Sequence, residues 1–232
     1  TRSEYSEYLG EHVDLGGAWL ADSHTRMHEL VQEFDVPLVR QFVTGKEVGI
    51  DGGDRHIGEV GSFPGQEAAL PEIQAAVAQL EAEIAGVDVN APWSHERADE
   101  YDAMTFRQWI DQNVELPASR ELLAISTNAF WGVLPEEVSF LEVLHLFKTC
   151  DDVLMMADTC TGAQSAHMMG SQLVSIKLAA TVNGVVSLNS PVRRITQDDH
   201  GVAVECDGTV WRGKQVICAL PPVMINRIEF AP

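Results

Sequence analysis

The hydrophobic pattern of this chain changes once, near Gly184, and this change constrains the fold more than any other feature. Between residues 62 and 183, apolar side chains recur every three or four positions, as they do along one face of a helix. After Gly184, short apolar runs alternate with turn sequences at 198–201 and 206–208, which is typical of short strands. Segregation of helices from strands in this way predicts an α+β protein, with a helical domain, a hairpin-containing mixed or antiparallel sheet, and a later β-meander.

The apolar spacing also predicts individual elements. A helix is expected to end at about Phe34, and either Asp22 or Ser23 could cap its start. Further helices are expected at 68–85, after Thr105, at 118–131, at 138–150 and at 171–182. A hairpin is expected around the turn at 51–54, between strands at 39–48 and 55–60. Further strands are expected at 185–188, 192–197, 201–206, 209–211 and 215–220.

Charge and composition exclude several classes of function. The formal net charge of −20 argues against a nucleic-acid partner, because phosphate binding requires a basic surface. No apolar stretch reaches the roughly 18–20 residues that span a bilayer, and the N-terminus lacks a signal-peptide pattern, so no membrane segment is expected. The cysteines, Cys150, Cys160, Cys206 and Cys218, show no metal-ligand spacing, so no metal site is expected, and a reducing, cytoplasmic location fits them.

The residues alone do not identify a catalytic group. The phosphate-binding glycine motifs, the G-x-S-x-G elbow and the H-E-x-x-H zinc motif are all missing. The adjacent carboxylates at 136–137 and 151–152 point in different directions on a helix or loop, so they do not form a converging acid and base. On this basis the sequence predicts only a globular domain that mixes helices and strands.

Four local motifs in a fixed order indicate more. These are DLGGAW at 14–19 before a helix, APW at 91–93 followed by YDAMT at 101–105 and Trp109, GSQL at 170–173 opening a helix, and NSPV at 189–192 followed by ALPP at 219–222. Each is weak alone, but in this order across nearly the whole chain they resemble the flavin-containing monoamine oxidase family. The chain departs from the family pattern at Met169, where the family has the first glycine of a pair.

The resemblance implies FAD as cofactor and assigns residues to it. Gly16 and Gly17 match the segment that reaches the isoalloxazine ring, and the absence of side chains would let the backbone approach it. Val192 matches the position whose backbone binds the adenine end, and Ala219 and Pro221 match the strand end and turn that lie against the cofactor. A tight turn, a strand core and an ordinary strand end are the plainer readings of these positions, and they stay open.

The resemblance also implies a cavity for an amine substrate. Its matching positions are Trp19, Ser126, Ala129, Phe130, Met156, Ala157 and Gln164. Gln164 is the most informative of these, because an amide in an apolar cavity requires a hydrogen-bond partner and can therefore orient a substrate. A core-facing stripe on the helix at 118–131, a buried tryptophan and a structural amide are the alternatives.

By the same resemblance, residues 1–36 and 183–232 belong to a partial FAD-binding domain, and residues 37–182 form the substrate-binding domain. The dinucleotide-binding unit of the family would precede Thr1, and its lysine and aromatic pair would follow Pro232. If 232 residues were the whole molecule, we would expect neither tight FAD binding nor turnover, and no catalytic residue is assigned within the chain.

The expected activity of the full enzyme is oxidation of an amine to an imine by hydride transfer to flavin, with O₂ reduced to H₂O₂. A non-catalytic fragment is one alternative. A related flavoenzyme, such as an amino-acid or polyamine oxidase, is another; an arginine gripping a carboxylate would indicate an amino-acid substrate, and Arg40, Arg107 and Arg120 are the candidates. A homodimer is also left open.

Overall fold

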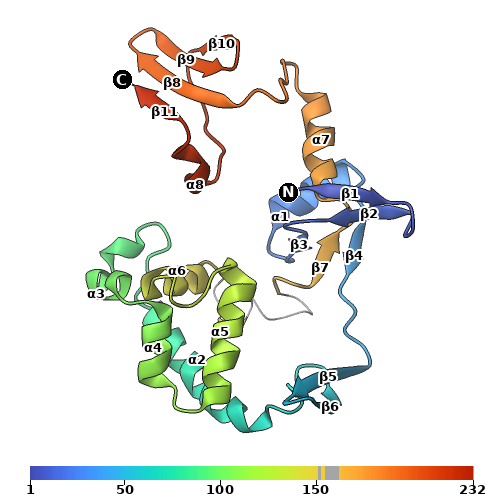
Figure 1. Ribbon diagram of the computed structural model, residues 1–232, viewed down its shortest axis with the longest axis vertical. Coiled ribbons are helices and arrows are strands. Elements are labelled where there is room, and N and C mark those ends of the chain that lie inside the picture. Colours follow the sequence, from blue (N-terminus) through green and yellow to red (C-terminus); the bar gives the residue numbers. More distant parts are fainter. Residues whose placement is uncertain (151–152, 155–161, 232) are drawn as a thin grey trace. The chain divides into compact units, whose positions relative to one another are not determined.

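The computed structural model describes residues 1–150, 153–154 and 162–231 (Figure 1). These residues form two compact units, one from Thr1 to Leu178 and one from Ala179 to Pro232, and each is described by itself. Both helices and sheets are present, as the periodicity predicts. In the part of the chain that the structure describes, no helix is both long enough and apolar enough to cross a membrane.

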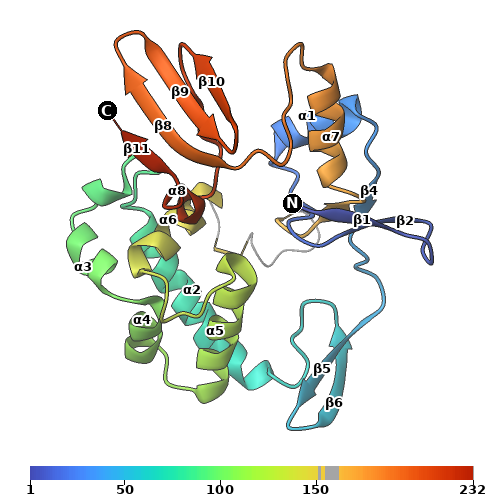
Figure 2. The ribbon, with the colours of Figure 1, turned by 45° about the horizontal axis from the view of Figure 1, so that its top comes forward.

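Most of the first unit's core lies in a cluster of helices (Figure 2). Its members are α2 (Leu70–Ile84), α3 (Ala98–Ala103), α4 (Phe106–Asn113), α5 (Pro117–Trp131) and α6 (Phe140–Cys150), with short 3₁₀ turns at Glu67–Ala69 and Pro92–Ser94. Phe140 is fully buried and stacks on Trp109 with ring centroids 5.2 Å apart, while Tyr101 meets the same ring edge-on at 4.9 Å. Aromatic contacts of these two geometries add to the burial of the rings, so Phe140 joins three helices.

Local sequence signals set the ends of several of these helices. Thr105 accepts a hydrogen bond from the backbone N–H of Gln108, and the Gln108 side chain accepts one from the Thr105 N–H, which completes a capping box before α4. Pro71 lies in the first turn of α2, where its missing N–H costs no helical hydrogen bond. Gly132 ends α5 with a φ of 68°, a conformation that glycine adopts without strain. The predicted helices at 68–85, 118–131 and 138–150 are therefore confirmed, each within a few residues.

A small antiparallel sheet forms a second core in the first unit. Strand β7 (Ala166–Met168) lies between β3 (Trp19–Leu20) and β4 (Leu38–Arg40), and α1 (Thr25–Glu33) connects the two outer strands. Val31 of α1 is buried in one cluster with Leu20 and Met168. The cap is different from the prediction: His24, not Asp22 or Ser23, precedes the helix, and the Asp22 carboxylate pairs with Arg40 at 2.7 Å.

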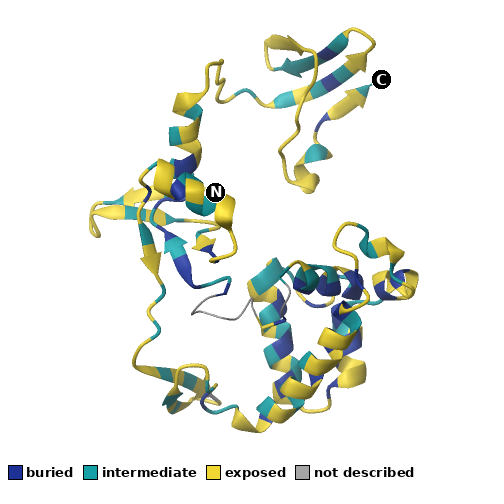
Figure 3. Cartoon of the chain, turned by 180° about the vertical axis from the view of Figure 1, so that it is seen from behind, coloured by how far each residue is buried: buried dark blue, intermediate teal, exposed yellow. Residues whose placement is uncertain are grey.

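Two hairpins and one helix complete the first unit. Strands β1 (Ser3–Ser6) and β2 (Glu11–Asp14) pair antiparallel, as do β5 (Lys46–Asp51) and β6 (Asp54–Glu59) around the predicted turn. Figure 3 shows that many of the buried residues lie in the helices, whereas residues 46–50 and β6 are exposed or partly exposed. Helix α7 (Gln172–Thr181) begins in the first unit and confirms the helix predicted at 171–182.

The second unit contains a four-stranded sheet in the order β10-β9-β8-β11. Strands β8 (Val192–Asp198), β9 (Gly201–Cys206) and β10 (Thr209–Gly213) form the predicted antiparallel meander, and β11 (Glu229–Ala231) pairs parallel with β8. A short helix, α8 (Pro222–Ile225), precedes β11. Ile195, Val202 and Ile228 form the core of this unit.

Two of the predicted strands are wrong. Residues 185–188 and 215–219 have no strand partner, and their aliphatic side chains are exposed, as Leu188 at 79% and Ile217 at 92% show. An apolar run fixes only which residues would suit a strand, whereas a strand also requires a neighbouring chain for its backbone N–H and C=O groups. Neither run finds that neighbour among the described residues.

Candidate functional site

A cavity of about 730 Å³ in the first unit brings together side chains from segments that are far apart in the sequence. Four predicted substrate residues line it, namely Trp19, Ala129, Phe130 and Gln164. Its volume lies within the range of about 300–1,000 Å³ that is usual for small-molecule sites. The cavity is therefore large enough for a ligand. The four predicted residues come from three separate segments, namely β3, α5 and the residues just before β7.

Trp19 enters the cavity from β3, the strand that pairs with β7. Its cross-strand partner is His167, and the two rings meet edge to face with centroids 5.7 Å apart. The Met168 N–H donates to the carbonyl of Ala18 at 2.9 Å and fixes the strand next to the tryptophan. Trp19 remains 46% exposed, so its ring is positioned by the sheet and still accessible to a ligand.

Ala129 and Phe130 lie near the C-terminal end of α5. Ser126, on the same helix, is not among the residues that line the cavity, and its hydroxyl donates to the carbonyl of Leu123 at 2.7 Å. Thr127 is fully buried and makes the equivalent bond to the same carbonyl at 3.0 Å. The α5 contribution to the cavity is thus a small methyl group and one aromatic ring.

Gln164 lies just before β7 and is half-buried. Its neighbour Ser165 is buried, and the Ser165 carbonyl accepts a hydrogen bond from the Gln41 N–H at 2.9 Å, which holds this segment against the chain that follows β4. The Gln164 amide makes no side-chain hydrogen bond within the part of the chain that the structure describes. An amide at the edge of a cavity that has no partner among these residues is available to a ligand.

The cavity also includes residues that sequence reasoning did not select. These are Ala21, Ser23, His24, Leu146, Thr149, Cys150 and Ala163. Leu146, Thr149 and Cys150 lie three and four positions apart on α6, so helical spacing could have identified this face once α6 was known to border a cavity. No comparable signal marks His24, because its position depends on the turn between β3 and α1.

Gly16 and Gly17 follow β2 at the surface, three and two residues before Trp19. Neither adopts a positive φ, and a Cβ at either position would meet only ordinary contacts with Thr1 or Arg2. Neither the backbone conformation nor the packing of the described chain therefore requires glycine here. The exposed, bare backbone suits close approach by a planar group, which is the role that the family resemblance implies.

The segment that contains these glycines is tied to the segment that contains GSQL. The Asp14 carboxylate accepts hydrogen bonds from the Gly170 N–H at 3.2 Å, the Ser171 N–H at 2.8 Å and the hydroxyl of Ser3. Burial acts to raise the pKa of Asp14, but the hydrogen bonds from Ser3 and Ser171 outweigh it and lower the pKa below its ordinary value. Two of the four motifs therefore lie side by side.

Met169 does not disturb this turn. The left-handed conformation falls on Gly170, with a φ of 97°, while the Met169 N–H donates to the Pro37 carbonyl at 2.8 Å. A Cβ on Gly170 would come within 2.9 Å of Leu173 and 3.0 Å of His12. The backbone conformation and the packing thus require glycine only at position 170, the second position of the family's glycine pair.

The remaining cofactor residues lie in the second unit. Val192 begins β8 and packs partly against Ile195 and Val202, so its side chain belongs to the strand core while its backbone lies at the sheet's end. Pro221 precedes α8, and Ala219 is exposed and outside any strand, which corrects the expectation of a strand end there. Met156 and Ala157 lie outside the described residues. The roles of all five cofactor residues stay predictions.

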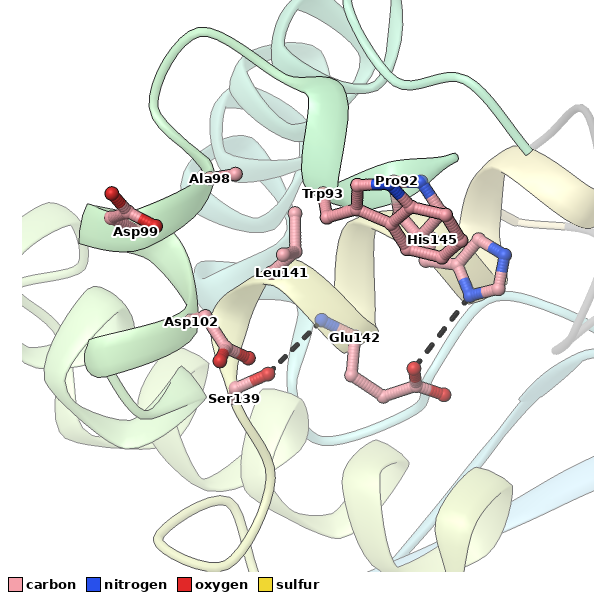
Figure 4. Close-up of a pocket in the computed structure, with 9 residues that line it drawn as sticks. All are labelled: Pro92, Trp93, Ala98, Asp99, Asp102, Ser139, Leu141, Glu142 and His145. Atoms are coloured by element: carbon pink, nitrogen blue, oxygen red, sulfur yellow. Dashed lines mark hydrogen bonds and ion pairs between the residues drawn. The ribbon is translucent and has the colours of Figure 1, made fainter. Parts of the chain in front are cut away.

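A second cavity, of about 340 Å³, lies beside α3 and α6, and none of the predicted substrate or cofactor residues lines it (Figure 4). Its walls include Asp99, Asp102, Glu142 and His145. Nε2 of His145 donates to the Val89 carbonyl at 3.1 Å, and Nδ1 of the same ring lies 3.6 Å from the Glu142 carboxylate, so both nitrogens of this histidine have structural partners. Among the described residues, no cluster of His, Cys, Asp or Glu has a geometry that could hold a metal ion.

Comparison with known proteins identifies the class. The family model for flavin-containing amine oxidoreductases matches residues 1–232, and the chain belongs to this family. Among similar sequences, one named "probable flavin-containing monoamine oxidase A" from Dictyostelium discoideum is 30% identical over 94% of this chain and 49% of its own length. Putrescine oxidase from Kocuria rosea is 28% identical over 96% of this chain and 50% of its own length.

The structure of cyclohexylamine oxidase from Brevibacterium oxydans IH-35A is similar in fold. It superimposes with a TM-score of 0.89 over 99% of this chain and 51% of that protein, at 24% identity. The chain thus spans about half the length of the relatives that it matches.

Proposed function

We propose that this chain is the substrate-cavity portion of an FAD-dependent amine oxidase that converts an amine to an imine, with O₂ reduced to H₂O₂. The observation that carries the proposal is the convergence of Trp19, Ala129, Phe130 and Gln164 on one cavity. Bound flavin would supply the two-electron acceptor for the hydride that leaves the substrate's α-carbon. Family membership supports this chemistry.

Gly16 and Gly17 fit the flavin ring, because they expose bare backbone two and three residues from a cavity tryptophan. Val192, Ala219 and Pro221 are the residues that we assign to the rest of the cofactor. We accordingly divide the chain into a partial FAD-binding domain at 1–36 and 183–232 and a substrate-binding domain at 37–182. FAD is expected to require more of the protein than this chain alone.

The walls of the cavity favour a neutral amine with an apolar body. None of the lining residues that the structure describes is Asp, Glu, Lys or Arg, so these residues offer an ammonium ion no counterion in exchange for its lost hydration. Phe130, Leu146 and Trp19 offer apolar contact, and the Gln164 amide can orient the polar end. These groups would hold the α C–H in place and exclude water, which is the contribution that positioning makes to the rate.

The arginines argue against an amino-acid substrate. Arg40 is paired with Asp22 at 2.7 Å, Arg107 with Asp111 at 3.2 Å, and Arg120 donates to the Val114 carbonyl at 2.6 Å. None of the three lines the cavity. A substrate carboxylate in this cavity would therefore find no bidentate partner among these three arginines.

Spectroscopy of the whole protein that contains this chain tests the proposal. We expect bound flavin, and we expect an amine from a panel of primary and secondary amines to bleach its absorbance anaerobically. Flavin that stays oxidised across the whole panel would contradict an amine oxidase. Protein that never retains flavin would instead support the alternative of a non-catalytic fragment, for which the exposed runs at 185–188 and 215–219 are the specific observation.

Location and assembly are part of the same proposal. We place the enzyme in the cytoplasm, because its cysteines lack disulfide-like or metal-like spacing. We propose a homodimer as its assembly, and light scattering of the purified protein tests this. A monomeric mass at micromolar concentration would contradict it.

A further inference from the structure

His24, the residue that immediately precedes α1, lines the candidate cavity. Among the lining residues that the structure describes, His24 and Cys150 are the two with a titratable side chain. Its ring is exposed in the first unit, and it also borders an adjoining, mainly apolar cavity of about 450 Å³ that includes Met27, Leu30 and Met168. A polar ring in such surroundings is well placed to contact a ligand.

One nitrogen of the ring is already occupied. Nδ1 of His24 accepts a hydrogen bond from the backbone N–H of Ala21 at 3.2 Å, and the His24 N–H donates to the Ala21 carbonyl at 3.0 Å. Nε2 of His28, one turn later on α1, donates to the same carbonyl at 3.0 Å. Ala21 is only 3% exposed, so its N–H depends on the His24 ring for a partner.

This contact fixes which tautomer the neutral ring adopts. A neutral imidazole has one acceptor nitrogen and one N–H, so a ring whose Nδ1 accepts must carry its hydrogen on Nε2. Nε2 of His24 has no hydrogen-bond partner among the residues that the structure describes. The backbone of Ala21 therefore sets up a single, oriented donor at the edge of the cavity.

We propose that His24 is a specificity-determining residue, whose Nε2–H donates to an acceptor atom on the amine substrate remote from the reacting nitrogen. The preferred substrates are accordingly amines whose apolar body carries an ether or similar acceptor. The inference rests on the proposed function, because it assumes that the cavity holds the amine. It adds a selection among amines that the apolar walls alone would not make.

Two substitutions separate the two roles of the ring. His24→Asn places a carbonyl oxygen where Nδ1 lies, so it keeps an acceptor for the Ala21 N–H and removes the distal donor. His24→Gln places an amide N–H₂ near the position of Nε2, so it keeps the distal donor and removes the acceptor. His28→Gln keeps the donor to the Ala21 carbonyl and serves as a control, because His28 is not among the residues lining the cavity.

The experiment uses two amines that cannot be oxidised because their α-carbon bears no hydrogen. One carries a methoxy group on an aromatic ring and the other an ethyl group of similar size. Calorimetry on the flavin-loaded whole protein measures the dissociation constant of each. We expect the wild type and His28→Gln to bind the methoxy amine roughly threefold to tenfold more tightly, the range that one hydrogen bond supplies.

His24→Asn is expected to remove this preference and His24→Gln to retain it. Equal affinities for the two amines in the wild type, or an unchanged preference in His24→Asn, would overturn the inference. Failure of the proposed function would be seen elsewhere, as flavin that no oxidisable amine reduces. Because affinity is measured with amines that cannot react, the two failures are distinguishable.

Discussion

Oδ1 of Asp14 accepts two hydrogen bonds from Ser171, one from the backbone N–H and one from the hydroxyl, each 2.8 Å long. The carboxylate lies at the end of β2, and Ser171 immediately precedes α7. Asp14 thus accepts hydrogen bonds from backbone N–H groups at the start of α7, as a helix-capping side chain does. Unlike an ordinary cap, it belongs to a distant segment of the chain.

Replacement of this carboxylate should lower stability. Asp14→Ala removes the partner of the Ser171 N–H and hydroxyl, and the expected loss is about 1–2 kcal/mol in the free energy of unfolding, as for other lost helix caps. Urea denaturation of the purified protein measures it. Glu11→Ala, on the exposed part of the same strand, is the matched control and should change stability by less than about 0.5 kcal/mol.

The same carboxylate should make stability depend on pH. Its pKa is lower in the folded protein than the ordinary 3.8, so the unfolded chain binds the proton more readily. This contribution is fully present above the unfolded pKa and is lost as the pH falls through the folded pKa. The wild type should therefore lose more free energy of unfolding than Asp14→Asn as the pH falls from about 5 to about 2, because Asp14 becomes protonated over this range. Parallel acid curves for the two proteins would contradict the assignment.

Gly17→Ala separates a flavin role from a structural one. The added Cβ would lie 3.9 Å from Thr1 Oγ1, and the backbone needs no positive φ, so unfolding should change by less than about 0.5 kcal/mol. Flavin content should nevertheless fall, because the methyl group would occupy the space proposed for the ring. The ratio of flavin to protein absorbance measures this, and unchanged flavin content would count against the role of Gly17.

Gly49→Ala, unlike Gly17→Ala, should lower the stability of the fold. A Cβ at Gly49 would lie 1.9 Å from the Pro64 carbonyl oxygen, whereas one at Gly58 would meet the hydroxyl of Ser62 at 2.3 Å. A backbone carbonyl cannot move aside as a serine side chain can, so Gly49→Ala should cost about 1–3 kcal/mol and Gly58→Ala less. Thermal unfolding of both variants gives the comparison, and equal effects would mean that the loop at 61–66 packs differently.

Gln164→Leu tests the cavity through kinetics. Loss of an amide that orients the substrate should lower kcat/KM for an amine by about tenfold, which corresponds to roughly 1.4 kcal/mol. Ser126→Ala is the control, because Ser126 bonds its own helix and is absent from the cavity wall. A larger loss in Ser126→Ala than in Gln164→Leu would place the substrate elsewhere.

Local chemistry in the sequence predicted much of the fold. The helix that follows Thr105 and the hairpin turn at 51–54 depend on interactions among residues a few positions apart, so they can be predicted without knowledge of the tertiary structure. The strands predicted at 185–188 and 215–220 failed because pairing depends on a neighbour that hydrophobicity does not specify. Conversely, β7 was missed because Ala166–Met168 has a short, mixed sequence, and it becomes a central strand only through β3 and β4.

The candidate site was predictable to a similar extent. Trp19, Ala129, Phe130 and Gln164 followed from a family resemblance, and the cavity brings them together. His24 and Thr149 could not be selected in this way, since one depends on the β3–α1 turn and the other on the contact of α6 with a segment far away in the sequence.

The bond between Asp14 and Ser171 joins residues 157 positions apart, and β3 has its described strand partner in β7, which is almost as distant. During synthesis, Asp14 and β3 therefore emerge long before Ser171 and β7, which they contact. The helices between Leu70 and Cys150 make local contacts and can form while the ribosome is still translating. The contact of Asp14 with Ser171 and the pairing of β3 with β7 must consequently wait until the last part of their unit has been made.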